Sequence, residues 1–138
     1  MEGRKAKLIR VPNDSDVRSW DLSPDGSRIA LPVFSVKAGD VRILPLDGGV
    51  PRTLSATSWT ELLAIAWAAD GKSLFLASNN SRGMTVLRMD SAGKTNLLLN
   101  QPGRDIHALA PSPDGHSLAF GAVQSNFNAW TIASFPRQ

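Results

Sequence analysis

The chain has 138 residues, of which 42% are hydrophobic and 20% charged, and its formal net charge is +3. This composition is typical of one folded globular domain and argues against disorder. The absence of cysteine excludes disulfides, thiolate metal sites and a cysteine nucleophile, and the scattered basic residues do not predict a nucleic-acid partner.

Apolar runs separated by Gly, Pro, Asp and Asn predict β-strands along the whole chain. A short strand is expected first, at residues 7–11, closed by Pro12. The later strands are expected near residues 17–22, 28–34, 41–46, 51–55, 62–67, 73–77, 84–89, 95–99, 106–110, 117–122 and 128–133. Residues 59–67 also fit one or two helical turns, but their place in a repeat favours a strand.

Three similar turns recur at steps of 45 and 44 residues, and such a period indicates a repeat architecture. Their Asp-Gly pairs are Asp25 and Gly26, Asp70 and Gly71, and Asp114 and Gly115. Ser-Pro precedes the first and third pairs, and Ala68-Ala69 replaces it in the second. Proline presets φ, the carboxylate bonds backbone N–H groups and glycine takes the left-handed position. The aspartates are therefore interpreted as structural turn residues rather than catalytic groups.

Four antiparallel strands in about 44 residues form the blade of a β-propeller, so the expected fold class is all-β. The repeats are expected at residues 17–55, 62–99 and 106–135, and the third lacks a fourth strand that residues 7–11 would supply. Three blades are too few to close a ring, since propellers usually have about four to eight. We expect half of a six-bladed ring closed in a homodimer, or part of a longer propeller.

The three turns and two further segments resemble those of a known protein family. The turns, Leu46-Asp47-Gly48-Gly49-Val50-Pro51-Arg52-Thr53-Leu54 and Asn128-Ala129-Trp130-Thr131-Ile132 resemble TolB-like, WD-type propeller repeats of bacteria. In particular, they are similar to the C-terminal propellers of acidobacterial serine/threonine kinases and winged-helix regulators, from about Arg18 to Phe135. The resemblance implies a sensor or interaction part of a signalling protein, with any kinase activity in an attached domain.

Catalytic patterns are missing from the sequence. It contains no kinase signature and no G-x-S-x-G elbow. His107 and His116 are the only histidines, and neither has a second ligand at metal-binding spacing. His107 beside Asp105 leaves a metal or base role open, with an ordinary strand-start histidine as the alternative. We expect no enzyme, no metal and no cofactor.

Binding is expected at the end of the sheets that carries the longer connections, because binding residues usually lie on loops held by a rigid scaffold. One of these connections is expected at residues 78–83. The candidate binding residues on the longer loops are Lys37, Trp59, Arg82, Arg104, Gln124 and Phe127. The other tryptophans, Trp20, Trp67 and Trp130, are expected to pack between blades. The expected partner is a protein or peptide, and the alternative is a small molecule or glycan at the propeller axis.

No apolar run approaches the length of a membrane span, and no apolar segment follows the basic N-terminus as in a signal peptide. The sequence therefore predicts a cytoplasmic protein without membrane contact, or the cytoplasmic or periplasmic part of a larger signalling protein.

Overall fold

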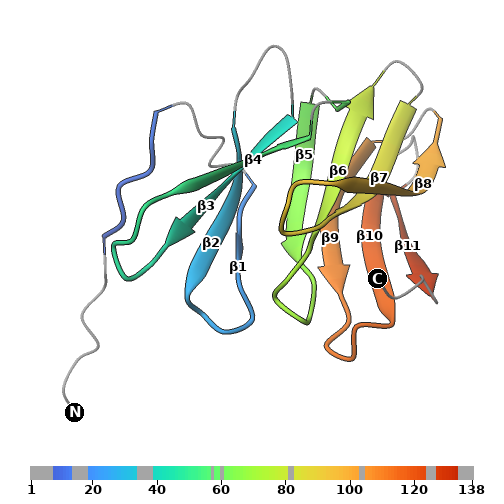
Figure 1. The fold of residues 1–138 in the computed structure, drawn as a ribbon. Helices are drawn as coiled ribbons and strands as arrows, with labels where there is room; N and C mark the ends of the chain where they lie inside the picture. The colour runs from blue at the N-terminus through green and yellow to red at the C-terminus, as the bar shows by residue number, and fades with distance from the viewer. Residues whose placement is uncertain are drawn as a thin grey trace.

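The chain folds into three antiparallel β-sheets arranged side by side (Figure 1). The structure, a computed structural model, describes residues 8–13, 19–33, 39–56, 58–59, 61–80, 83–102, 105–123 and 127–133, with backbone only at 80 and 127–130. Each sheet is a meander whose consecutive strands pair with one another. The predicted all-β fold of propeller-type blades is confirmed.

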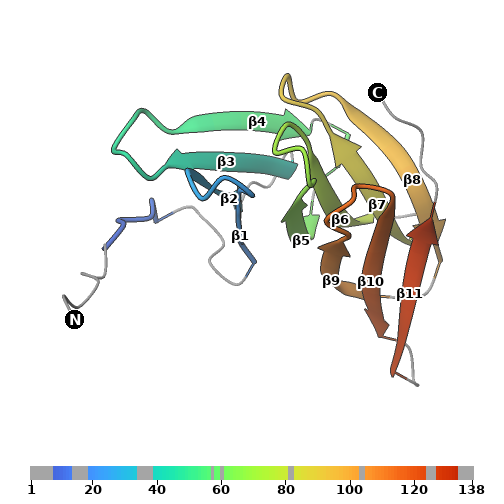
Figure 2. The same cartoon turned by 90° about the horizontal axis from the view of Figure 1, so that it is seen from below.

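The three sheets, called blades 1, 2 and 3, follow one another along the chain. Blade 1 contains β1 (Asp21–Leu22), β2 (Arg28–Val33), β3 (Gly39–Pro45) and β4 (Arg52–Ala56). Blade 2 contains β5 (Glu61–Trp67), β6 (Leu74–Asn80), β7 (Gly83–Met89) and β8 (Thr95–Gln101). Blade 3 contains β9 (Asp105–Pro111), β10 (Ser117–Val123) and β11 (Phe127–Ala133). Blade 2 lies between the other two (Figure 2).

One local expectation is confirmed in blade 2 and another is corrected. Residues 61–67 form β5, as their place in the repeat predicts, and the segment pairs with β6 along its length. The connection expected at residues 78–83 is shorter than predicted, since β6 continues to Asn80 and β7 begins at Gly83. Pairing of Asn79 with Met84 extends the hairpin beyond the apolar run that marked the strand.

Residues 8–13 do not form the strand expected at residues 7–11 within this single chain; Lys7 lies outside the described residues. A strand needs the free edge of a sheet as its hydrogen-bonding partner. Instead, Ile9 and Val11 lie against the face of blade 1 and line a cavity there with Trp20. Completion of blade 3 by this segment of a second copy stays a prediction.

The apolar side chains are buried in two seams between blades. One cluster joins Val41 and Ile43 of blade 1 to Trp67 and Leu76 of blade 2. A second cluster joins Phe75 of blade 2 to blade 3. Because side chains alternate between the faces of a strand, β6 supplies Leu76 to the first seam and Phe75 to the second. Blade 2 is therefore covered on both faces.

The Asp-Gly turns connect the first two strands of each blade and lie together at the lower end in Figure 1. Each aspartate accepts a hydrogen bond from the backbone N–H two residues later, at 3.0 Å for Asp25, 2.9 Å for Asp70 and 2.9 Å for Asp114. The following glycines have φ of +71°, +66° and +74°, a conformation that costs a residue with a Cβ about 1–2 kcal/mol.

Candidate interaction surface

Repeat-equivalent positions give each blade two unlike faces. A shift of 45 residues along the sequence leads from a position in blade 1 to the equivalent position in blade 2, and a further 44 residues lead to blade 3. The strand pairings agree with these shifts, because the equivalent pairs are Leu22 with Ile29, Trp67 with Leu74 and Pro111 with Leu118. We define the large-residue face as Trp20, Leu22, Ile29 and Leu31 in blade 1, Ile65, Trp67, Leu74 and Leu76 in blade 2, and Leu109, Pro111, Leu118 and Phe120 in blade 3.

The opposite face carries smaller side chains. We define the small-residue face as Ser19, Asp21, Ala30 and Pro32 in blade 1, Ala64, Ala66, Phe75 and Ala77 in blade 2, and Ala108, Ala110, Ala119 and Gly121 in blade 3. At both seams the small-residue face of one blade contacts the large-residue face of the next: Ala30 clusters with Leu74, and Ala77 clusters with Leu118. The chain therefore repeats one mode of contact between blades.

Polar contacts reinforce the seam between blades 1 and 2. The Asp21 carboxylate accepts a hydrogen bond from the Trp67 backbone N–H at 2.7 Å, and the Trp67 indole N–H donates to the Asp21 carbonyl at 3.2 Å. The Arg28 guanidinium lies 4.7 Å from the Trp67 ring centroid and donates to the Gly71 carbonyl at 3.0 Å. Trp67 therefore packs between blades, as the sequence predicted.

In blade 1 the large-residue face has no blade against it within the described chain. Its Trp20 is 59% exposed and Leu22 is 44% exposed, whereas the equivalent Ile65 and Trp67 of blade 2 are 5% and 6% exposed. Within the described chain Trp20 does not pack between blades as expected, because blade 1 has a described neighbour only on its other face. The Trp130 side chain lies outside the described residues.

The outer part of this face is partly covered. Residues 9 and 11 line a cavity of about 280 Å³ together with Trp20, Ile29, Leu31 and Leu44. Leu31 and Leu44 are buried, while Trp20 and Leu22 on the inner side remain open. An exposed group of large apolar side chains is a typical mark of an interaction surface.

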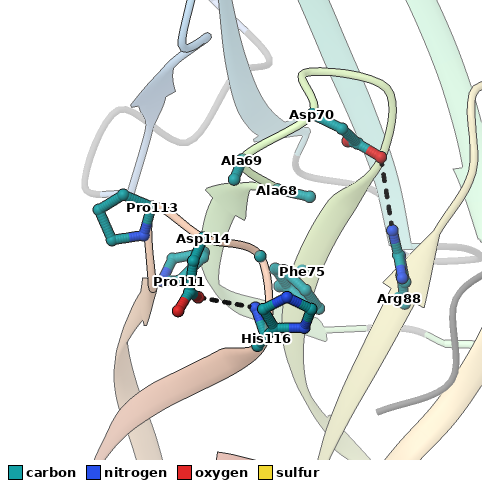
Figure 3. Close-up of a pocket in the computed structure, with 10 residues that line it drawn as sticks. Ala68, Ala69, Asp70, Phe75, Arg88, Pro111, Pro113, Asp114 and His116 are labelled. Atoms are coloured by element: carbon teal, nitrogen blue, oxygen red, sulfur yellow. Dashed lines mark hydrogen bonds and ion pairs between the residues drawn. The ribbon is translucent and has the colours of Figure 1, made fainter. Parts of the chain in front are cut away.

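A second hollow lies between the Asp-Gly turns of blades 2 and 3 (Figure 3). Its volume is about 440 Å³, and its walls include Phe75, Pro111 and Pro113 beside the charged groups of Asp70 and Arg88. Arg88 lies 3.6 Å from the Asp70 carboxylate, and its Nε donates to the Ser73 hydroxyl at 2.9 Å. The hollow therefore combines apolar walls with an ion pair.

Hydrogen bonds within the turns lower the pKa of two carboxyl groups. The Ser112 hydroxyl donates to Asp114 at 2.5 Å and, with the His116 backbone N–H, holds the pKa of Asp114 below its ordinary value. In the first turn, the Ser23 hydroxyl donates to Asp25 at 2.6 Å, and Ser27 adds further bonds. Together these bonds lower the pKa of Asp25 to about 2.

The predicted loop candidates are not brought together by the described structure. Lys37, Arg82, Arg104 and Gln124, and the side chain of Phe127, lie outside the described residues. Trp59 is half-buried against the first seam, its indole N–H donates to the Thr95 hydroxyl at 3.3 Å, and its carbonyl accepts from the Gly39 N–H. This tryptophan ties two blades together rather than standing free on a loop.

Sequence reasoning missed the open face of blade 1. The equivalence of Leu22 and Trp67, both apolar, predicts a face that packs against a blade, but it does not predict that the neighbouring blade is absent from the described chain. Among the described residues no three His, Cys, Asp or Glu side chains gather at metal-binding range, and no helix there is long and apolar enough to cross a membrane.

The fold is similar to that of proteins of known structure. No protein-family model matches the chain, and no curated protein matches its sequence. Among solved structures it is similar to TolB from Acinetobacter baumannii, with a TM-score of 0.69 and 21% identity over 83% of this chain and 29% of that one. The chain therefore has a β-propeller fold like that of TolB.

Other propellers show the same likeness. A chain of a nidogen/laminin complex matches with a TM-score of 0.70 and 14% identity, covering 83% of this chain and 43% of that one. Hydrazine synthase from Kuenenia stuttgartiensis matches with a TM-score of 0.57 and 16% identity, covering 75% and 38%. The chain therefore spans less than half the length of each matched chain, and the likeness concerns the fold alone.

Proposed function

We propose that this chain is a non-catalytic protein-interaction module and that the open large-residue face of blade 1 is its contact surface. The observation that carries this proposal is the exposure of Trp20 and Leu22 at positions whose equivalents in blade 2 are buried against another blade. Buried aromatic anchors such as tryptophan carry a large share of the binding energy of protein interfaces. The other face of blade 1 packs against blade 2, which holds the sheet in place, so binding costs little ordering of the surface.

We propose further that the chain is a sensor part of a bacterial signalling protein in the cytoplasm, in keeping with the family resemblance. The partner is a protein or peptide with an apolar surface. Two copies of three blades would supply a six-bladed ring, which lies within the usual range of about four to eight blades. A homodimer closed in this way is therefore one assembly in which the face would be used.

Site-specific photocrosslinking in cells that express the chain tests this function. A photoreactive amino acid replaces Leu22, which is 44% exposed on the proposed surface. We expect a crosslinked product of defined mass, because a bound protein would lie within reach of this position. Leu97 of β8, which is 55% exposed on another blade, provides the matched control position.

The two positions have different expected outcomes. Crosslinking at Leu22 but not at Leu97 supports the proposed surface. Equal products at both positions would indicate random collisions, and no product at Leu22 would show that the surface binds no protein in the cell. Either of these results contradicts the proposal.

The hollow between blades 2 and 3 favours a second candidate function, the binding of a small polar molecule or glycan. Its volume of about 440 Å³ falls within the range of small-molecule sites, about 300–1,000 Å³. Adding monosaccharides and amino acids while following backbone amide NMR signals tests this function. Shifts confined to Asp70 and Gly115 would support it, and unchanged signals at millimolar concentrations would exclude these ligands.

A further inference from the structure

We infer that the large-residue face of blade 1 binds the small-residue face of blade 3 in a second copy of this chain. This inference rests on the proposed function, since it names the partner of the same surface. Blade 3 has no described blade beyond its small-residue face, so both halves of one repeated contact are open at opposite ends of the three-blade unit. Two copies would bring these two faces together in the same way as neighbouring blades meet within one chain.

The seam between blades 2 and 3 provides the precedent. There Ala64 and Ala77 form one buried cluster with Leu118 and Phe120. The positions equivalent to these alanines in blade 3 are Ala108 and Gly121, which have side chains equally small or smaller. A Cβ built on Gly121 would lie 3.6 Å from the Ala108 Cβ, in ordinary contact, so the two residues share one flat patch.

Side-chain volumes on the two open faces are complementary. Ala119 stands in blade 3 where blade 2 has Phe75, so blade 3 offers a shallower surface. Trp20 stands in blade 1 where blade 3 has Leu109, so blade 1 offers a larger side chain. Interfaces tolerate such exchanges when the total volume is kept. The proposed contact between the two copies would therefore fill its space with a different distribution of the same kind of side chains.

The segment at residues 8–13 and the edge of β11 fit the same assembly. Ile9 and Val11 cover the outer part of the blade 1 face, and a docked blade would displace them. The third sheet ends at β11, which has no further strand beside it within the described residues. A displaced segment would find in this edge of the second copy the hydrogen-bonding partner that it lacks in the single chain.

The ring needs two identical contacts related by a two-fold axis. Each contact joins two different faces, and closure after two copies prevents open chains of subunits. Leu22 is equivalent to Trp67, which contacts Asp21 across the first seam. Because Ala110 of blade 3 is equivalent to Asp21, Leu22 is expected to lie opposite Ala110 of the second copy.

Sedimentation equilibrium of the full chain over the micromolar range tests this pairing. The wild-type chain should show twice the mass of one chain. Leu22→Glu and Ala110→Lys should each weaken dimerisation by at least ~100-fold, because each places an unpaired charge in an apolar contact. Val50→Glu changes an 88% exposed turn residue and should leave the dimer intact.

An equimolar mixture of Leu22→Glu and Ala110→Lys gives the sharpest test. In a mixed dimer one contact keeps both native faces, and the other sets the new carboxylate opposite the new ammonium group. The mixture should therefore form dimers although each variant alone does not. Both altered residues are exposed in the single chain, and thermal unfolding of each variant checks that the fold is kept.

Several outcomes would overturn the inference. These are a wild-type chain that stays monomeric, variants that dimerise as well as the wild type, and folded variants that stay monomeric when mixed. The proposed function fails separately, because it depends on the crosslink at Leu22. A monomeric chain that crosslinks to a different protein would keep the function and exclude the second copy as partner.

Discussion

At the scale of single residues, Asp21 shows how one side chain connects two blades. Its carboxylate accepts the Trp67 N–H, and its backbone carbonyl accepts the indole N–H of the same tryptophan. The equivalent residue in blade 2 is Ala66, which has no polar side chain. The polar connection is therefore particular to the first seam, whereas the apolar contact is common to both seams.

Asp21→Ala should lower the free energy of unfolding by about 1–3 kcal/mol, because the N–H of Trp67, whose residue is only 6% exposed, loses its acceptor. Urea denaturation measures the change. Asp47→Ala serves as the control, since that exposed carboxylate accepts the Gly49 N–H within its own turn. Equal stability of the two variants would show that the Asp21 contact contributes nothing.

Asp25 should make stability depend on pH in the acid range. Its pKa is about 2 in the folded chain against an ordinary value of 3.8, so the unfolded state binds more protons between these values. Its contribution is fully present above about pH 4 and is lost as the pH falls through 2.

Urea unfolding measured from pH 5 to pH 2 checks the prediction for Asp25. Asp25→Asn should reduce the loss of stability on acidification. Ser23→Ala removes the largest cause of the lowered pKa and should act in the same direction. An unchanged pH profile in both variants would contradict the prediction.

At the scale of elements, the middle turn differs from its two counterparts. In the outer turns the Ser23 and Ser112 hydroxyls donate to the aspartate and also accept a backbone N–H from the start of the next strand, at 3.0 Å and 2.9 Å. Ala68 has no hydroxyl for these bonds, yet the turn keeps the same backbone bonds from Gly71 to Ala68 and from Ala68 to Ser73. The backbone of the middle turn is therefore compatible with the Ser-Pro-Asp-Gly sequence of the outer turns.

Ala69→Pro should raise the free energy of unfolding by about 0.4–1 kcal/mol, because proline reduces the freedom of the unfolded chain without strain at a compatible position. Pro24 and Pro113 occupy the equivalent positions of the other turns. Pro24→Ala is the reverse control and should lower stability by a similar amount. Thermal unfolding that shows a less stable Ala69→Pro variant would refute the equivalence of the turns.

At the scale of the whole molecule, burial is uneven across the blades. Leu74, Phe75, Leu76, Met84, Leu87 and Met89 of blade 2 are at most 2% exposed. Blades 1 and 3 are each covered by a described blade on one face only. In repeat proteins the stability of a unit depends on the interfaces with its neighbours, so the central blade should be the most stable.

Hydrogen exchange followed by mass spectrometry should detect this difference. The amides of β6 and β7 should exchange last, and those of β1 and β11 first, because local opening is easiest where few apolar contacts are lost. Raising the protein concentration should slow exchange in β1 and β9 if the second copy binds there. Uniform exchange of all three blades would contradict the expected order.

The sequence alone was enough to predict the repeat, the strands and the turns. These features depend on local chemistry: proline and glycine conformations, carboxylates that bond nearby N–H groups, and apolar runs at a fixed period. For this reason the bounds of β2, β7 and β11 lie within two residues of the predicted ones. The TolB-like resemblance rests on the same turns together with residues 46–54 and 128–132.

Only the tertiary structure decided which apolar residues are covered. Trp20 and Trp67 both lie in apolar runs, yet one is 59% exposed and the other 6% exposed. Likewise, residues 9 and 11 contact a sheet face instead of extending a sheet. Burial and strand pairing depend on whether a neighbouring blade or edge is present, and a local pattern carries no information about that neighbour.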